Sequence, residues 1–270
     1  DAEAQTNGSN PSTWTLTVED IQTNQAIAIG SDFLLVGSNF EEGDHQGVLV
    51  RVSNDGAVQW RAEFPEVISG GLIGAAVDAD ENIYTVARQQ IDGSALHVLH
   101  KISGQNGIPL WQKVLGIEDQ LPLGQSLSLV RRHSQGVYLL TVNTVVKVTT
   151  DGSEPGTAVD WIRTIPTGQE FFGSGPVSFY SATAIDGDHL WAAGHAGTPV
   201  FFWHFRILLS ADDGSTRDIF ETLPFGGGSN TFHDIITLAD HNIALSSHPW
   251  FGSLYRFVKR FDGENPQWTG

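Results

Sequence analysis

One pattern recurs five times along this chain and constrains its fold more than any other feature. It is clearest from Gly71 to Leu115, where four short runs rich in β-branched and aromatic residues are separated by turn-forming residues. The other copies begin near Ala26, Ser126, Ser181 and His233. Four-stranded copies at a period of about 45 to 55 residues are typical of the blades of a β-propeller. We therefore expect an all-β chain of about five antiparallel, four-stranded blades.

Three positions repeat within these copies. The third strand carries a basic residue, the turn after it a glycine, and the fourth strand a tryptophan. In the first three copies these residues are Arg51, Gly56 and Trp60, then Lys101, Gly107 and Trp111, then Lys147, Gly152 and Trp161. In the fourth copy we expect Phe220 at the position of the tryptophan.

The segments AVDADENIYTVA and LHKISGQNGIPLW resemble the bacterial β-propeller repeat called SBBP and its PQQ-like relatives. The resemblance extends as repeats over about 250 residues. It implies a propeller blade and, as is common in those families, an extracellular or periplasmic location, without implying an activity. The quinone-binding residues of quinoprotein dehydrogenases cannot be placed on this sequence. Small five-bladed lectins are similar in size and closure, although no lectin motif is present.

The two ends of the chain predict how the ring closes. Trp14 to Val18 alternates like a strand but has no partner strand before it, and the last copy stops at Gly270 without a full fourth strand. We expect the N-terminal strand to complete the last blade, because this removes two exposed sheet edges. The alternative is a slice of a ring of six to eight blades. Residues 1–13 are then a flexible tail with an N-glycosylation sequon at Asn7, and residues 14–270 form one propeller domain.

The composition excludes several classes of partner. A net charge of −17, with only 14 Lys and Arg residues, argues against binding to nucleic acids and to anionic membranes. No apolar run approaches the roughly 18 residues of a membrane span, so we expect no membrane insertion. The chain has no Cys and no Met, which excludes disulfides, Cys-based zinc sites and thiol nucleophiles. Because sulfur side chains are oxidation targets, a sulfur-free chain suits an extracellular or cell-surface location.

Candidate binding residues gather where the second strand of a blade leads into the third. This position follows a small residue and differs between the copies, which hold Ser38, Arg88, Val142, His195 and His248. In the fifth copy His233 and Asp234 start the first strand on the same rim, so with His248 they could hold a metal or act as acid and base. Trp250 is expected in a loop, where a sugar or a protein could stack on it. The predicted ligand-binding rim is therefore Arg88, His195, His233, Asp234, His248 and Trp250.

Many aspartates are expected at the opposite end of the blades, in tight turns, where Asp and Asn hydrogen-bond to the backbone. The turn Asp78 to Asn82 resembles the start of a calcium loop, but Ile83 stands at the glycine position and Gln89 at the position of the bidentate glutamate. We predict no cofactor and no metal, with calcium at this turn as the open alternative.

The sequence contains no nucleophile elbow, no zinc-protease motif and no phosphate loop. We therefore expect a non-enzymatic binding or structural module that recognises glycans or associates with itself. One alternative is a glycan-binding, lectin-like propeller. Another is a hydrolase or lyase at the channel mouth, which would need His233, Asp234 and His248 to converge.

Overall fold

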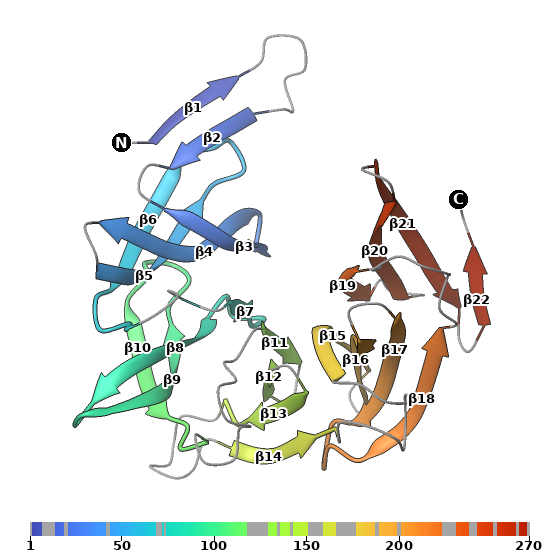
Figure 1. Cartoon of the computed structure of the whole chain (residues 1–270). Helices are drawn as coiled ribbons and strands as arrows, with labels where there is room; N and C mark the ends of the chain where they lie inside the picture. The colour runs from blue at the N-terminus through green and yellow to red at the C-terminus, as the bar shows by residue number, and fades with distance from the viewer. Residues whose placement is uncertain are drawn as a thin grey trace. The chain divides into compact units, whose positions relative to one another are not determined.

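The computed structural model describes 22 strands and the turns between many of them (Figure 1). The described residues are 2–6, 14–18, 21–41, 44–68, 72, 74–117, 129–133, 136–140, 143–150, 159–165, 177–186, 189–198, 201–222, 231–237, 242–250, 253–262 and 265–268. No helix among them is long and apolar enough to cross a membrane. The strands form one two-stranded sheet and five four-stranded antiparallel sheets, as the fivefold repeat predicted.

The chain divides into two compact units, and the first comprises residues 1–120 and 151–158. Its two-stranded sheet pairs β1 (Ala2–Thr6) with β2 (Trp14–Val18). Sheet 1 contains β3 (Gln22–Ile29), β4 (Asp32–Glu41), β5 (Asp44–Val52) and β6 (Val58–Phe64). Sheet 2 contains β7 (Ala75–Val77), β8 (Ile83–Ile91), β9 (Ser94–Ile102) and β10 (Pro109–Val114).

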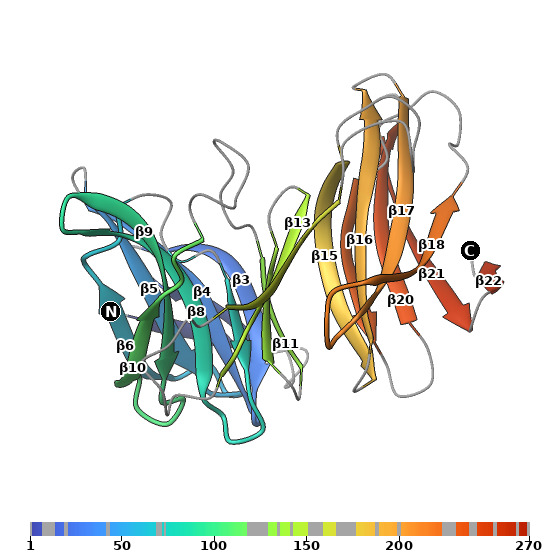
Figure 2. The same ribbon diagram turned by 90° about the horizontal axis from the view of Figure 1, so that it is seen from below.

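The second unit comprises residues 121–150 and 159–270. Sheet 3 contains β11 (Leu129–His133), β12 (Gly136–Leu140), β13 (Thr144–Val148) and β14 (Val159–Thr164). Sheet 4 contains β15 (Val177–Asp186), β16 (His189–Thr198), β17 (Phe201–Ser210) and β18 (Thr216–Thr222). Sheet 5 contains β19 (Thr231–Thr237), β20 (Asn242–Trp250), β21 (Ser253–Asp262) and β22 (Asn265–Trp268). In each sheet the strands follow one another in chain order, and Figure 2 shows β15, β16 and β17 side by side.

The N-terminal strand pairs differently from the prediction. Trp14–Val18 lies antiparallel to Ala2–Thr6, which is a strand within the segment predicted to be a flexible tail. In sheet 5 the place beside β21 is taken by β22, so the last copy supplies its own fourth strand. Among the described strands, none of the pairing joins β2 to β21. Closure into a ring and a single domain over residues 14–270 remain predictions. The predicted glycosylation site, Asn7, lies outside the described residues.

In the second copy the sequence predicts strands at residues 83–87 and 96–102, and both are longer in the structure. In sheet 2, β8 continues to Ile91 and β9 starts at Ser94, joined by Asp92 and Gly93, which have φ values of 49° and 83°. Two consecutive positive φ values fit a tight hairpin turn whose twist matches that of the strands. Arg88 therefore lies inside a strand, paired with His97. Trp250 is likewise the last residue of β20, paired with Ser253, and the prediction of a loop position for it was wrong.

Packing of sheets face to face explains the burial pattern. The middle strands β8 and β12 are buried on both faces over five consecutive residues, whereas the outer strands β6 and β10 alternate between half-buried and exposed residues. In the first unit, an apolar cluster that includes Leu34, Leu49, Ile83 and Ile102 joins sheets 1 and 2. A second cluster, which includes Tyr138, joins sheets 3 and 4. This burial of apolar area is the main stabilising contribution to each unit.

The basic residue and the tryptophan of the repeat pair with one another in four sheets, including Lys259 with Trp268 in sheet 5, but not in sheet 4. Arg51 pairs with Trp60, Lys101 with Trp111 and Lys147 with Trp161, each beside a one-residue shift of register. In sheet 4 the same shift places Leu208 opposite Asp218, while Phe220 pairs with Arg206. The expectation that Phe220 replaces the tryptophan was therefore wrong, and an exposed aspartate stands there instead.

Candidate functional site

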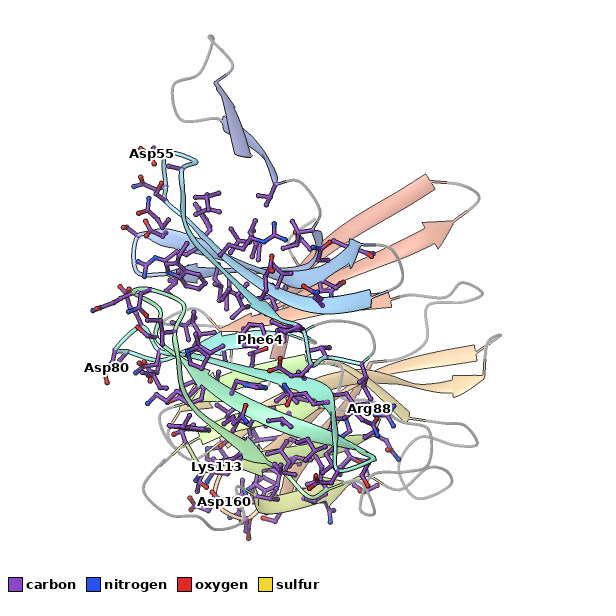
Figure 3. The ribbon with its side chains drawn as sticks, turned by 90° about the vertical axis from the view of Figure 1, so that its left-hand side faces the viewer. Asp55, Phe64, Asp80, Arg88, Lys113 and Asp160 are labelled. Carbon is purple, nitrogen blue, oxygen red and sulfur yellow. The ribbon has the colours of Figure 1, made fainter. Side chains whose placement is uncertain are left out.

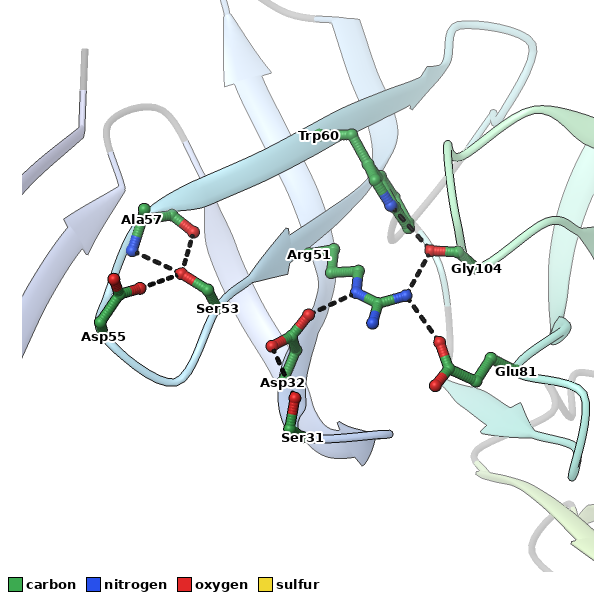
Figure 4. Close-up of polar contacts among 9 residues, drawn as sticks. All are labelled: Ser31, Asp32, Arg51, Ser53, Asp55, Ala57, Trp60, Glu81 and Gly104. Carbon is green, nitrogen blue, oxygen red and sulfur yellow. Dashed lines mark hydrogen bonds and ion pairs between the residues drawn. The ribbon is translucent and has the colours of Figure 1, made fainter.

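One end of sheets 1 and 2 is held together by Arg51 (Figure 4). Its Nε donates to Asp32 over 2.8 Å, and its Nη1 donates to Glu81 over 2.9 Å and to the carbonyl oxygen of Gly104 over 2.8 Å. The indole Nε1 of Trp60 donates to the same Gly104 oxygen over 2.8 Å. Because Glu81 and Gly104 belong to two turns of sheet 2, these bonds join the two sheets at what we name the turn end.

The second unit repeats part of this arrangement between sheets 3 and 4. Trp161 donates through Nε1 to the carbonyl oxygen of Ala211 over 3.2 Å. Three residues later in each accepting turn, Gly107 and Gly214 have φ values of 72° and 68°. A Cβ atom at either glycine would lie 2.8 Å or less from the indole of Trp60 or Trp161. The tryptophan of the preceding sheet therefore packs directly against this glycine, where a side chain would not fit.

The aspartates of the turn end serve as hydrogen-bond acceptors. Asp78 accepts bonds from the backbone N–H groups of Asp80 and Asn82, over 2.9 and 2.7 Å, and from the hydroxyl of Tyr84 over 3.1 Å. Burial alone would raise the pKa of Asp78, but the bonds from Asn82, Tyr84 and Asp80 outweigh it and lower the pKa. Its carboxylate is thus engaged in closing the turn. Among the side chains that the structure describes, no group of three or more His, Asp and Glu residues could hold a metal ion.

Arg88 lies at the opposite end of sheet 2 from Asp80, as Figure 3 shows. We name this the loop end, because the connection between sheets 1 and 2 runs beside it. The N–H of Ile68 donates to the carbonyl oxygen of Arg88 over 3.0 Å, and Val67 forms a bridge with Gln89. The connection from sheet 1 to sheet 2 and the connection between β8 and β9 therefore lie at the same end of sheet 2.

The guanidinium of Arg88 differs from three other cations of its unit. Arg51, Arg61 and Lys101 each lie within 3.9 Å of a carboxylate oxygen. Arg88 is exposed, and no ion pair joins it to another residue of the described part of the chain. Arg88 is thus a solvent-exposed cation whose backbone belongs to strand β8.

A chain of hydrogen bonds runs from the surface into sheet 2 beside Arg88. The Nε2 of Gln89 donates to Glu66 over 3.1 Å and lies 3.1 Å from the Nε2 of His100. An amide nitrogen donates and does not accept, so the Nε2 of His100 is the acceptor and its proton is on Nδ1. The His100 ring is 1% exposed and lies edge-on to Phe64, with the centroids 5.5 Å apart. A neutral histidine thus lies in the contact between sheets 1 and 2.

Burial of His100 predicts a pH dependence of stability. Desolvation lowers the pKa of His100 below its ordinary value of 6.5, although the charge of Glu66 opposes the shift. Below that value the unfolded chain binds a proton that the folded chain does not, so the free energy of unfolding falls as the pH falls. We expect the wild type to lose more stability than H100Q between about pH 7 and about pH 5 in urea unfolding. Parallel curves for the two proteins would contradict this.

The remaining predicted rim residues belong to sheets 4 and 5, and the strand register gives their places. His195 pairs with Ser178 and with His204. The remaining three rim residues of sheet 5 are placed as follows. Asp234 pairs with Leu245, His233 stands at a register shift between Phe232 and Asp234, and His248 pairs with Tyr255. His233 is opposite the step from Leu245 to Ser246, at least two residues before His248 on β20. Convergence of the trio thus stays a prediction.

Sequence reasoning missed two groupings. It did not bring Glu66, Gln89 and His100 together, because they come from the connection after β6 and from two strands of sheet 2. It also did not place His204 opposite His195, because the strand predicted at residues 190–195 continues to Thr198 and this extension sets the register.

The sequence matches no protein-family model and no curated protein. Several solved structures are similar. The AfRom2 CNH domain is 10% identical with a TM-score of 0.51, over 97% of this chain and 71% of that one. A subtype N10 neuraminidase-like protein of A/little yellow-shouldered bat/Guatemala is 11% identical with a TM-score of 0.52, over 92% of this chain and 81% of that one. The Dos1 propeller has a TM-score of 0.45 at 11% identity, over 86% of this chain and 66% of that one.

The first two of these likenesses, with TM-scores above 0.5, agree with the five sequential four-stranded sheets. The fold is of the β-propeller type. Identities this low show the fold alone, so membership of the SBBP or PQQ-like families is not shown and the resemblance stays at the level of the repeated blade.

Proposed function

We propose that this chain is a non-enzymatic binding module of the β-propeller type, secreted or displayed at a cell surface, whose ligand binds at the loop end. The proposed binding residues are Arg88 in the first unit and, in the second unit, His195, His233, Asp234, His248 and Trp250. Support comes from the unequal roles of the two ends. At the turn end of the first unit, the charged groups of Arg51, Asp32 and Glu81 bond to one another. At the loop end, the exposed guanidinium of Arg88 is available to a ligand.

Variation among equivalent positions supports the same conclusion. The position of Arg88 in sheet 2 is taken by Ser38 in sheet 1, His195 in sheet 4 and His248 in sheet 5, so the scaffold does not require any one of these residues. The turn end, in contrast, repeats its tryptophan bonds in two sheet pairs. Repeated residues serve the fold, and residues that differ between copies are where a specific ligand is recognised.

The chemistry of Arg88 favours a ligand with a single carboxylate. A guanidinium binds a carboxylate through two parallel hydrogen bonds, which gives both affinity and orientation. A polyanion is disfavoured by the net charge of −17. A short glycan that ends in a uronic acid meets both conditions, and it suits a protein outside the cell.

The test is calorimetric titration with two oligosaccharides of equal length, one ending in glucuronic acid and one in glucose. We expect the acidic probe to bind more tightly, and R88A to weaken its binding about tenfold or more, since a charged hydrogen bond contributes about 1.5 to 3 kcal/mol. The matched control is R61A, which removes the same charge from a residue already paired with Glu63 at 2.8 Å. Equal binding by the wild type and R88A, or an equal loss in R61A, would overturn the proposal.

A further inference from the structure

One hydrogen-bond chain of the first unit connects a surface carboxylate to a buried titratable ring. Gln89 on β8 is 3% exposed, and its Nε2 lies 3.1 Å from the Oε1 of Glu66 and 3.1 Å from the Nε2 of His100. Glu66 is exposed and belongs to the connection that leaves sheet 1 after β6. The chain therefore runs from solvent, through a single amide group, to a ring that is 1% exposed.

The bonds of this chain fix the place of each proton. An ionised carboxylate only accepts hydrogen bonds, so the atom of Gln89 that faces Glu66 is its amide nitrogen. The second hydrogen atom of that nitrogen is donated to the Nε2 of His100, which therefore carries no proton. The two bonds thus require a neutral imidazole and an ionised carboxylate at the same time.

A proton on the Nε2 of His100 is incompatible with this arrangement. The protonated ring nitrogen is a donor, so it would face the amide nitrogen of Gln89, which is also a donor. Turning the amide by half a turn presents its oxygen to the ring, but the same oxygen then faces the carboxylate of Glu66. Two acceptors without a proton between them repel each other. A bond from Gln89 to the protonated ring therefore excludes the bond to Glu66.

Glu66 is the charged group that acts on His100. Its charge opposes the lowering of the His100 pKa by burial. His97 and Lys101 lie three residues and one residue from His100 along β9, so they belong to the other face of the sheet. The other neighbours that the bonds, the register and the ring contacts give to His100 are uncharged: Thr85, Gln89 and Gln112 in sheet 2 and Phe64 in sheet 1.

The Glu66 bond is one of three contacts that hold the connection between sheets 1 and 2 against β8. Val67 forms a bridge with Gln89 and packs in the apolar cluster, and the N–H of Ile68 donates to the carbonyl oxygen of Arg88 over 3.0 Å. Loss of the Glu66 bond removes the contact nearest to solvent and leaves Val67 in the core. The connection should then loosen while the sheets stay folded.

We propose that Glu66, Gln89 and His100 form a proton-sensitive latch, which holds residues 66–68 against β8 near neutral pH and releases them when His100 is protonated. The latch itself needs no ligand. Its regulatory consequence rests on the proposed function, because residues 66–68 lie beside Arg88. Acidification then changes the surface proposed to bind a carboxylate, and a ligand bound at neutral pH is held less tightly in acid.

The experiment is nuclear magnetic resonance of the full ¹⁵N-labelled chain without ligand, between about pH 7.5 and about pH 5. The ring nitrogens of His100 report its protonation, which we expect with a midpoint below 6.5. Over the same range, the backbone order parameters of residues 66–68 should fall from about 0.85, typical of rigid backbone, toward about 0.6. Those of the turn-end residues 103–107 should stay at about 0.85. Signals of the folded chain are measured, so global unfolding does not enter the result.

Two substitutions should keep the latch closed in acid for different reasons. H100Q offers an acceptor to Gln89 and has no proton to gain, while E66Q supplies an amide that can turn and donate when the oxygen of Gln89 faces it. The matched control is E63Q, which removes the same charge from an exposed residue paired with Arg61, and it should loosen as the wild type does. E66Q changes a surface position, so the test does not depend on the folding of H100Q.

Three results would overturn the latch. Residues 66–68 could stay rigid after His100 is protonated, or they could loosen equally in E66Q and in the wild type. His100 could also stay neutral down to the pH at which the chain unfolds. Because no ligand is present, these results are independent of whether the carboxylate probe binds at Arg88.

Discussion

Replacement of Arg51 with alanine should lower the free energy of unfolding by about 2 to 3 kcal/mol, measured by urea denaturation. The side chain of Arg51 is 13% exposed, and its removal leaves the carboxylates of Asp32 and Glu81 close together without a cation. It also leaves the carbonyl oxygen of Gly104 with one donor, Trp60, in place of two. The loss is therefore larger than that expected for a surface ion pair, because several partly buried groups lose a partner at once.

The matched control for this change is R61A in the adjacent strand. Arg61 pairs with Glu63 at the same distance of 2.8 Å, but the two side chains are 30% and 47% exposed. Solvent screens such a pair, so the expected loss is at most about 0.5 kcal/mol. Equal losses in R51A and R61A would show that Arg51 does not join sheets 1 and 2 in the way described.

Replacement of Gly104 with alanine should cost about 3 kcal/mol of stability. A Cβ atom at Gly104 would lie 2.0 Å from the backbone carbonyl oxygen of Glu81 and 2.7 Å from the Cδ1 of Ile29. Backbone atoms cannot move aside as a flexible side chain can, so the two turns must separate. Their separation also breaks the bonds from Arg51 and Trp60. The double variant with G104A and R51A should therefore lose less stability than the sum of the two single losses.

The control for Gly104 is G93A. Gly93 has a φ of 83°, but a Cβ atom there meets nothing within 4 Å. Its replacement should cost only the strain of a left-handed backbone, about 1 kcal/mol. A thermal or urea denaturation series on both variants checks the difference, and a G104A protein as stable as G93A would contradict the close contact of the two turns.

The fold was predictable because its signals are local and repeated. The order of strands and the aspartates in the turns can be recognised within one copy of the repeat, and so can the tryptophan opposite a basic residue, which recurs in every sheet except sheet 4. Strand ends were less predictable. Arg88 and Gln89 are polar and resemble loop residues, yet the turn at Asp92 and Gly93 extends both strands past them.

Long-range arrangements were not predictable from the repeat. Several strands of similar pattern could have paired with the strand at Trp14–Val18. Its partner in the structure, β1, was not recognised as a strand in the sequence. The bonds from Gln89 on β8 reach Glu66, in the connection after β6, and His100 on β9, and no periodicity signals them. The sequence identified the rim positions at which the copies differ. The pairing of His195 with His204 could be recognised only from the register of the strands.

The most direct test of the account asks at which end of the first unit a ligand binds. Hydrogen–deuterium exchange with the glucuronic acid-terminated oligosaccharide measures this without a substitution. We expect slower exchange at residues 88–97, around the turn of Asp92 and Gly93, when the probe is bound. Slower exchange at the turn-end residues 78–82 and 103–107, with residues 88–97 unchanged, would contradict the assignment of the loop end as the binding surface.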